Sequence, residues 1–130
     1  MTLFAGVFLD DRSRVELISW WRNRVGVALL DLIYCDHVTI SYAPSYEDVD
    51  RFAKLKGDPC TVRVIGIGID EKAQAVLVET FPFKSMNKFP HVTVAARHGV
   101  DPVYSNDLLS REMKLVHGPE LSGSFDLRDT

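Results

Sequence analysis

The tetrapeptide His37-Val38-Thr39-Ile40 returns later in the chain as His91-Val92-Thr93-Val94. Both copies lie in short stretches that predict β-strands: 34–42 is rich in β-branched and aromatic residues, and 91–97 has β-branched residues at three successive positions. Because side chains alternate across a strand, each copy presents its histidine and threonine on one face and its aliphatic residues on the other. If the two strands are neighbours, two imidazoles and two hydroxyls converge on one pocket.

Such a pocket contains the groups that phosphodiester cleavage requires. Two histidines with an ordinary pKa near 6.5 can supply one neutral and one protonated ring at physiological pH. The neutral ring removes a proton from the attacking water, and the protonated ring donates one to the leaving oxygen. The hydroxyls of Thr39 and Thr93 can bind the non-bridging phosphate oxygens. A lone strand histidine is usually structural, so it is the repetition that favours catalysis.

The remaining pattern predicts a mixture of strands and short helices. The predicted elements are a strand at 2–9, helices at 13–24, 45–57 and 105–110, a hairpin at 60–69 and 74–80, an irregular loop at 81–90, and strands at 113–117 and 120–127. Ser13, with Glu16 three residues later, predicts the first helix cap, and Ser45 predicts the second. Residues 27–33 could either continue the first helix or form a separate turn.

Composition limits the class of protein. The chain has 130 residues, of which 46% are hydrophobic and 25% charged, so we expect one globular domain over residues 1–130. The net charge of −3 disfavours a broad surface for polyanions, although a local pocket for one phosphate stays open. No uncharged run is long enough to span a bilayer. Two cysteines without C-x-x-C spacing are typical of a reducing cytoplasm.

The spacing of the histidines does not favour a metal site. The sequence contains no H-x-H or H-E-x-x-H pattern, so we expect neither a metal nor another cofactor.

The paired H-x-[ST]-hydrophobic motifs resemble the signature of the 2H phosphoesterase superfamily and match it at every position. The stretch His91–Leu109 is similar to the second-motif region of one branch of that superfamily, and Gly6–Arg14 resembles its first strand and helix entry. This branch includes 2′,3′-cyclic-nucleotide 3′-phosphodiesterase and the phosphodiesterase domain of tRNA ligases. The resemblance implies a bilobal α+β fold, in which two antiparallel sheets related by a pseudo-twofold axis flank a central groove, with helices on the outside.

The same resemblance implies an activity and its residues. Members of this branch hydrolyse the 2′,3′-cyclic phosphates of RNA ends or nucleotides to 2′-phosphates. By analogy His37 would protonate the leaving 3′ oxygen, His91 would activate water, and Thr39 and Thr93 would bind the phosphate. The implied partners are RNA 2′,3′-cyclic phosphate ends or small cyclic nucleotides. No membrane partner is implied, and we expect a monomer.

Three further residues are candidates for substrate binding. Strand alternation predicts that Ser41 shares the face of His37, and that Arg97 shares the face of His91 and could reach the phosphate. Phe83 could stack on a base, or it could seal the edge of the core. By the same alternation, Tyr42 faces away from His37.

Two other functions stay open. The same chemistry could degrade cyclic oligonucleotide signals of antiviral defence. Alternatively, the chain could be an RNA-binding module without turnover, although binding alone would not need two titratable bases.

Overall fold

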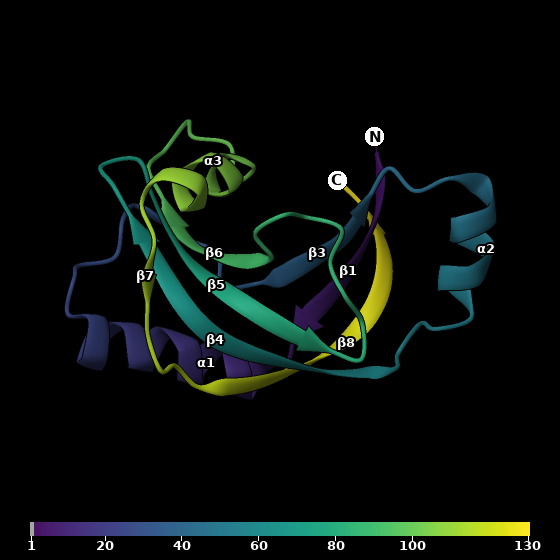
Figure 1. Ribbon diagram of the computed structural model, residues 1–130, viewed down its shortest axis with the longest axis horizontal. Coiled ribbons are helices and arrows are strands. Elements are labelled where there is room, and N and C mark those ends of the chain that lie inside the picture. Colours follow the sequence, from purple (N-terminus) through teal and green to yellow (C-terminus); the bar gives the residue numbers. More distant parts are fainter. Residues whose placement is uncertain (1) are drawn as a thin grey trace.

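The strand β1 (Leu3–Leu9) is paired on both sides, with β3 (His37–Tyr42) along one edge and β8 (Glu120–Asp129) along the other. These and all other strand pairs are antiparallel in the computed structural model, which describes residues 2–130 (Figure 1). The predicted hairpin is confirmed as β4 (Pro59–Ile69) and β5 (Ala73–Phe81).

The strands join into one sheet that closes on itself. Along the sheet the order is β2-β6-β3-β1-β8-β4-β5, and β5 also pairs with β6 (His91–Ala96), which completes a ring of six strands. Two short strands, β2 (Leu32–Ile33) and β7 (Lys114–Leu115), extend β6 and β4. The expected α+β class is confirmed, but the described strands do not form two separate sheets. The reason is that β6 pairs with β5 on one side and with β3 on the other, and so joins the two halves.

The first helix, α1 (Asp11–Trp20), continues into a π-helical turn at Trp21–Val25 and stops at Gly26, whose φ of 72° favours glycine. Its predicted cap was wrong. The carboxylate of Asp10 accepts from the amide of Ser13 at 2.7 Å, and Ser13 itself is buried.

Residues 27–33 follow neither of the two predictions made for them. Residues 27–31 are not helical, and Leu32–Ile33 form β2 against β6.

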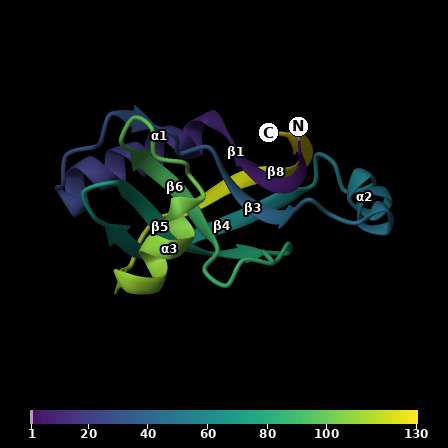
Figure 2. The same ribbon diagram turned by 90° about the horizontal axis from the view of Figure 1, so that it is seen from above.

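Two further helices lie at opposite ends of the molecule (Figures 1 and 2). The second helix, α2 (Tyr46–Ala53), has the predicted cap, because the Ser45 hydroxyl accepts from the amide of Asp48 at 3.3 Å. In Figure 2 it projects away from the sheet. The third, α3 (Tyr104–Arg111), packs on β4, β5 and β6. None of the helices in residues 2–130 is long and apolar enough to cross a membrane.

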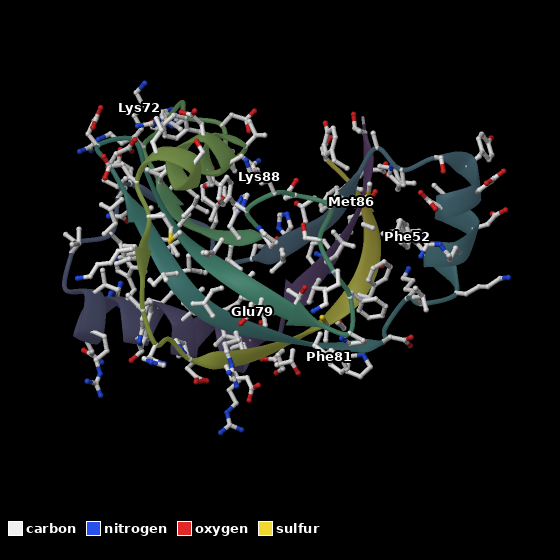
Figure 3. The ribbon with its side chains drawn as sticks, in the orientation of Figure 1. Phe52, Lys72, Glu79, Phe81, Met86 and Lys88 are labelled. Carbon is white, nitrogen blue, oxygen red and sulfur yellow. The ribbon has the colours of Figure 1, made fainter. Side chains whose placement is uncertain are left out.

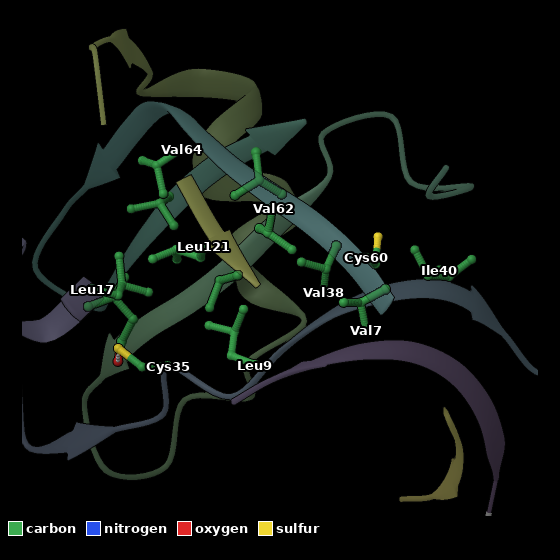
Figure 4. Packing of buried hydrophobic residues seen from close by; sticks show 14 of the residues in the cluster. Val7, Leu9, Leu17, Cys35, Val38, Ile40, Cys60, Val62, Val64 and Leu121 are labelled. Carbon is green, nitrogen blue, oxygen red and sulfur yellow. Dashed lines mark hydrogen bonds between the residues drawn. The ribbon is translucent and has the colours of Figure 1, made fainter. Parts of the chain in front are cut away.

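The main core fills the face of the motif strands opposite to their histidines. Val7, Val38 and Leu17 are fully buried there (Figure 4). Val92 and Trp21 are fully buried in the same core. Each such side chain stabilises the fold by about 1.5–3 kcal/mol. This packing fixes which face of β3 and β6 is turned inward, and it therefore decides where His37 and His91 point.

Candidate active site

The two motif strands meet at one residue pair. Val38 on β3 lies opposite Val92 on β6 in antiparallel register. This order places His37 across from Thr93 and Thr39 across from His91, all on the face opposite to the valines. The predicted convergence of the two motifs is therefore present, and the four polar side chains are related by a local twofold arrangement.

Beyond this pair the strands separate, and the loop at 82–90 takes over as the partner of β3. The Ser85 hydroxyl donates to the carbonyl of Thr39 at 2.6 Å, and the amide of Met86 donates to the carbonyl of Ile40 at 2.8 Å. At the end of this loop, the carbonyl of Pro90 accepts from the amide of Val78 on β5 at 2.9 Å. Figure 3 shows Met86 on this loop, close to β3. The loop thus spans the region where the motif strands part.

His37 is held by a carboxylate and two aromatic rings. Its Nδ1 lies 3.0 Å from Oδ2 of Asp36, and its ring centroid lies 5.2 Å from that of Phe4 and 5.1 Å from that of Phe8. Burial lowers the pKa of His37 below its ordinary value, and the charge of Arg128 lowers it further. The hydrogen bond and charge of Asp36 oppose this shift.

His91 is held by a backbone carbonyl. Its Nδ1 lies 2.8 Å from the carbonyl oxygen of Phe89, and the residue is 9% exposed. Burial lowers the pKa of His91, the bond to Phe89 raises it, and the charge of His37 lowers it. The last effect means that His91 is close enough to His37 to feel its charge.

The contacts of the two histidines decide which ring nitrogen faces the substrate. A carbonyl oxygen can only accept, so Nδ1 of His91 carries its proton, and Nε2 of the neutral ring is free to accept one. Nδ1 of His37 donates to the Asp36 carboxylate, which favours the protonated imidazolium. Within residues 2–130, no side chain or backbone group bonds Nε2 of either ring. The pair is therefore arranged as one potential base and one potential acid.

The two threonines have different surroundings. Oγ1 of Thr93 lies 2.9 Å from the hydroxyl of Ser105, a fully buried residue of α3. The hydroxyl of Thr39 has no hydrogen-bond partner among the described residues, and Gly6 lies opposite Thr39 on β1. The ring of Phe8 covers Gly6 beside Thr39, since a Cβ at position 6 would lie 3.1 Å from Cε2 of that ring.

A bulge in each motif strand changes the faces that simple alternation predicts. In β3 the register passes from Thr39 opposite Gly6 to Ser41 opposite Ala5, which leaves Ile40 unpaired. Ser41 is therefore buried on the core face and does not share the face of His37. Tyr42, which was expected to face away, lies opposite Phe4 on the His37 face and is 63% exposed.

The second bulge explains the position of Arg97. In β6 the register passes from Thr93 opposite Ala75 to Ala95 opposite Gln74, so Val94 is the unpaired residue. The guanidinium of Arg97 then lies at the strand end, where its Nε donates to the carbonyl of Glu71 at 2.8 Å. The structure does not bring Arg97 to the histidines.

Phe83 also lies away from the site. Its ring packs against Phe125 with centroids 4.7 Å apart, at the edge of the main core. Of the two roles considered for Phe83, the structure shows the core contact.

Five side chains near the site were not identified from the sequence. Asp36 could have been found, because it directly precedes the first motif. Phe4, Phe8 and Arg128 are far from both motifs along the chain, and only strand pairing brings them near. Ser105 follows Val94 by 11 residues, and the packing of α3 brings it to Thr93. No local pattern marks them.

Comparison with solved structures shows the fold. The crystal structure of a fungal RNA kinase superposes with a TM-score of 0.62 at 14% identity, covering 95% of this chain and 45% of that one. The crystal structure of TT0787 of Thermus thermophilus superposes with a TM-score of 0.52 at 18% identity, covering 98% of this chain and 87% of that one. The chain thus spans less than half of the fungal RNA kinase chain.

Comparison with protein families identifies the sequence. A search of curated proteins gives no match. The sequence model of the fungal tRNA ligase phosphodiesterase domain matches residues 34–124, a span that contains both tetrapeptides and most of the chain. The resemblance stated from the motifs is thereby confirmed, and the chain belongs to the family of fungal tRNA ligase phosphodiesterase domains.

Proposed function

We propose that the chain is a metal-independent phosphodiesterase that hydrolyses 2′,3′-cyclic phosphates, at RNA ends or in nucleotides, to 2′-phosphates. The observation that carries this proposal is the arrangement of His37 and His91 on one face around the Val38–Val92 pair, each with Nδ1 bound by the protein. Membership of a phosphodiesterase domain family agrees with it.

In the proposed reaction the two histidines have different roles. Neutral His91 accepts a proton from water at Nε2, and the water oxygen bonds to phosphorus. The bond from phosphorus to the 3′ oxygen breaks, and protonated His37 gives its Nε2 proton to that oxygen. The 2′-phosphate remains, His91 releases its proton to solvent, and His37 takes up a proton from solvent. The carboxylate of Asp36 supports the acid, while a carbonyl partner leaves His91 suited to be the base.

Three neighbouring side chains would bind the substrate. The hydroxyls of Thr39 and Thr93 lie across from the two imidazoles, where they can donate to the non-bridging oxygens. The exposed ring of Tyr42 lies on the same face and offers a surface on which a base can stack. The substrate would thus be a phosphate ester that carries a base.

A substrate panel tests the proposal. Purified protein is incubated with 2′,3′-cyclic AMP, a short RNA with a 2′,3′-cyclic end, and a 3′,3′-cyclic dinucleotide, each with and without EDTA. Chromatography that separates 2′-AMP from 3′-AMP identifies the product. We expect 2′-phosphates from the first two substrates, unchanged by EDTA and absent with His37→Ala or His91→Ala.

Each competing function has its own outcome in this panel. Turnover of the cyclic dinucleotide alone would favour degradation of cyclic oligonucleotides. Tight RNA binding without turnover would favour a binding module, and loss of activity in EDTA would contradict the metal-independent mechanism. The variants His98→Ala and His117→Ala are matched controls, because these histidines lie outside both motifs.

A further inference from the structure

Arg128 on β8 lies on the same face of the sheet as His37. It pairs with Phe4 of β1, and Phe4 in turn pairs with Tyr42 of β3. The central guanidinium carbon lies 3.6 Å from the ring centroid of Phe8, and that ring is stacked on His37. One aromatic ring therefore separates the cation from the imidazole.

The guanidinium is held in place but keeps free donors. Its Nε lies 3.2 Å from Oδ2 of Asp126, and Lys56 lies 3.7 Å from the other oxygen of the same carboxylate. Two cations and one carboxylate leave this cluster with a net positive charge. The Arg128 side chain is half-exposed, and no other described acceptor takes its terminal N–H groups. A preorganised guanidinium with free donors is suited to bind a phosphate.

The reacting phosphate is not the ligand that we assign to Arg128. That phosphate would lie between the two motifs, at the junction of β3 and β6. Arg128 lies on the other side of His37, two strands from β3 and beyond the ring of Phe8. Gly6 pairs with both Thr39 and Asp126, and the ring of Phe8 lies over it. An extended RNA strand that reaches from the histidines to Arg128 would therefore pass over the ring of Phe8.

We propose that Arg128 forms a second phosphate subsite, which binds the phosphodiester on the 5′ side of the terminal nucleotide of an RNA. This inference rests on the proposed function and specifies its substrate class. An oligonucleotide with a cyclic end has this internal phosphate, and a cyclic mononucleotide does not. The subsite makes RNA ends the preferred substrate.

The test compares two substrates that differ in this phosphate. The values of kcat and KM are measured for 2′,3′-cyclic AMP and for the dinucleotide ApA with a 2′,3′-cyclic end, each at the pH optimum of the variant. Loss of a hydrogen bond to a charged group corresponds to about a 10- to 100-fold change. We expect Arg128→Ala to lower kcat/KM for the dinucleotide by about this factor, mainly through KM, with less than about a twofold change for cyclic AMP.

Arg51→Ala is the matched control. Arg51 also stacks on a phenylalanine, Phe52, and bonds an aspartate, Asp48, but it lies on α2. This variant should leave both substrates unchanged.

A neutral linkage separates charge recognition from other effects. A dinucleotide in which a methylphosphonate replaces the internal phosphodiester lacks the charge that Arg128 would bind. With this substrate, kcat/KM of the wild-type protein should fall by the same 10- to 100-fold factor. The Arg128→Ala variant should have the same kcat/KM for the neutral and the charged dinucleotide. If Arg128→Ala lowers kcat/KM equally for cyclic AMP and for the charged dinucleotide, or lowers it for neither, the proposed subsite is overturned.

Failure of the proposed function has a different signature, which is a wild-type protein that turns over neither substrate. Binding of the dinucleotide 2′-phosphate, measured by calorimetry against its methylphosphonate analogue, then decides the subsite without turnover. If the wild-type protein binds the dinucleotide 2′-phosphate and its methylphosphonate analogue with equal affinity, the proposed subsite is overturned.

Discussion

Val38 lies opposite Val92 where β3 meets β6, and this pair brings together two histidines that are more than 50 residues apart in the sequence. The valines point into the core, so the flanking His37 and His91 point away from it. The contact that joins the two motif strands therefore also positions the candidate catalytic groups.

The pH dependence of activity should reflect the lowered pKa values of both histidines. Burial is the largest cause in each case. The base must be neutral and the acid protonated, so the two limbs of the kcat/KM profile follow the two histidines as a coupled pair. We expect a bell-shaped profile with its optimum below about pH 6.5, the ordinary pKa of histidine. A rate that does not vary between pH 5 and 8 would contradict two-histidine catalysis.

Asp36→Asn should move one limb of that profile. The carboxylate raises the pKa of His37, so its removal lowers this pKa further. The basic limb, which follows loss of the proton from the acid, should move to lower pH. The rate at pH 7 should fall about tenfold for each pH unit by which this limb moves. Movement of the acidic limb instead would assign His37 as the base.

Gly6→Ala should impair the site through the ring that supports His37. A Cβ at this position would lie 3.1 Å from Cε2 of Phe8 and 3.2 Å from the carbonyl oxygen of Val38. The ring of Phe8 must move, and His37 is stacked on it. We expect a loss of about 1–3 kcal/mol in the free energy of unfolding, from overpacking, together with a lower kcat. Activity is measured below the melting temperature of the variant, and an unchanged kcat would show that Phe8 does not position His37.

Ser105→Ala should act through Thr93. Removal of the Ser105 hydroxyl leaves Oγ1 of Thr93 without its 2.9 Å partner and should destabilise the protein by about 1 kcal/mol. Thr93→Val should lower kcat by about 10²–10³, the usual effect of losing one donor to a developing charge. In the Thr93→Val background, Ser105→Ala should have no further effect on kcat. Additive losses in the double variant would show that Ser105 acts independently of Thr93.

Stability should depend on the same histidines. Their pKa values are lowered in the folded state, so below about pH 6.5 the unfolded chain binds more protons. Their contribution to stability is complete above this pH and is lost as the pH falls through the folded-state values. The free energy of unfolding should fall by up to about 1.4 kcal/mol per pH unit for each histidine. Urea titrations between pH 7 and 5 measure this slope, which His37→Gln with His91→Gln should flatten.

Most elements could be predicted because local patterns specify them. The hairpin at β4 and β5 and the Ser45 cap depend on neighbouring residues, and both were correct. The first cap was wrong by three residues: the carboxylate of Asp10 caps the helix, while the hydroxyl of Ser13 accepts from the amide of Ser122 on a distant strand. The two-sheet arrangement was also wrong, because local patterns do not show that β6 pairs on both sides.

The candidate site shows the same division. The tetrapeptide motif fixes the faces of His37 and Thr39, and of their counterparts, over three residues. One position further on, a bulge at Ile40 turns Ser41 into the core and Tyr42 onto the His37 face. A bulge depends on the partner strand, so alternation within one strand does not reveal it.

By itself, the sequence determined the chemical groups of this protein: two imidazoles and two hydroxyls at strand spacing, repeated once. These follow from residue identity and from the two-residue period of a strand. Only the tertiary structure decided that Val38 meets Val92, that Asp36 and a backbone carbonyl hold the two rings differently, and that Arg128 lies beside Phe8. Such contacts join residues far apart in the chain, and they depend on how the strands close into one sheet around a shared core.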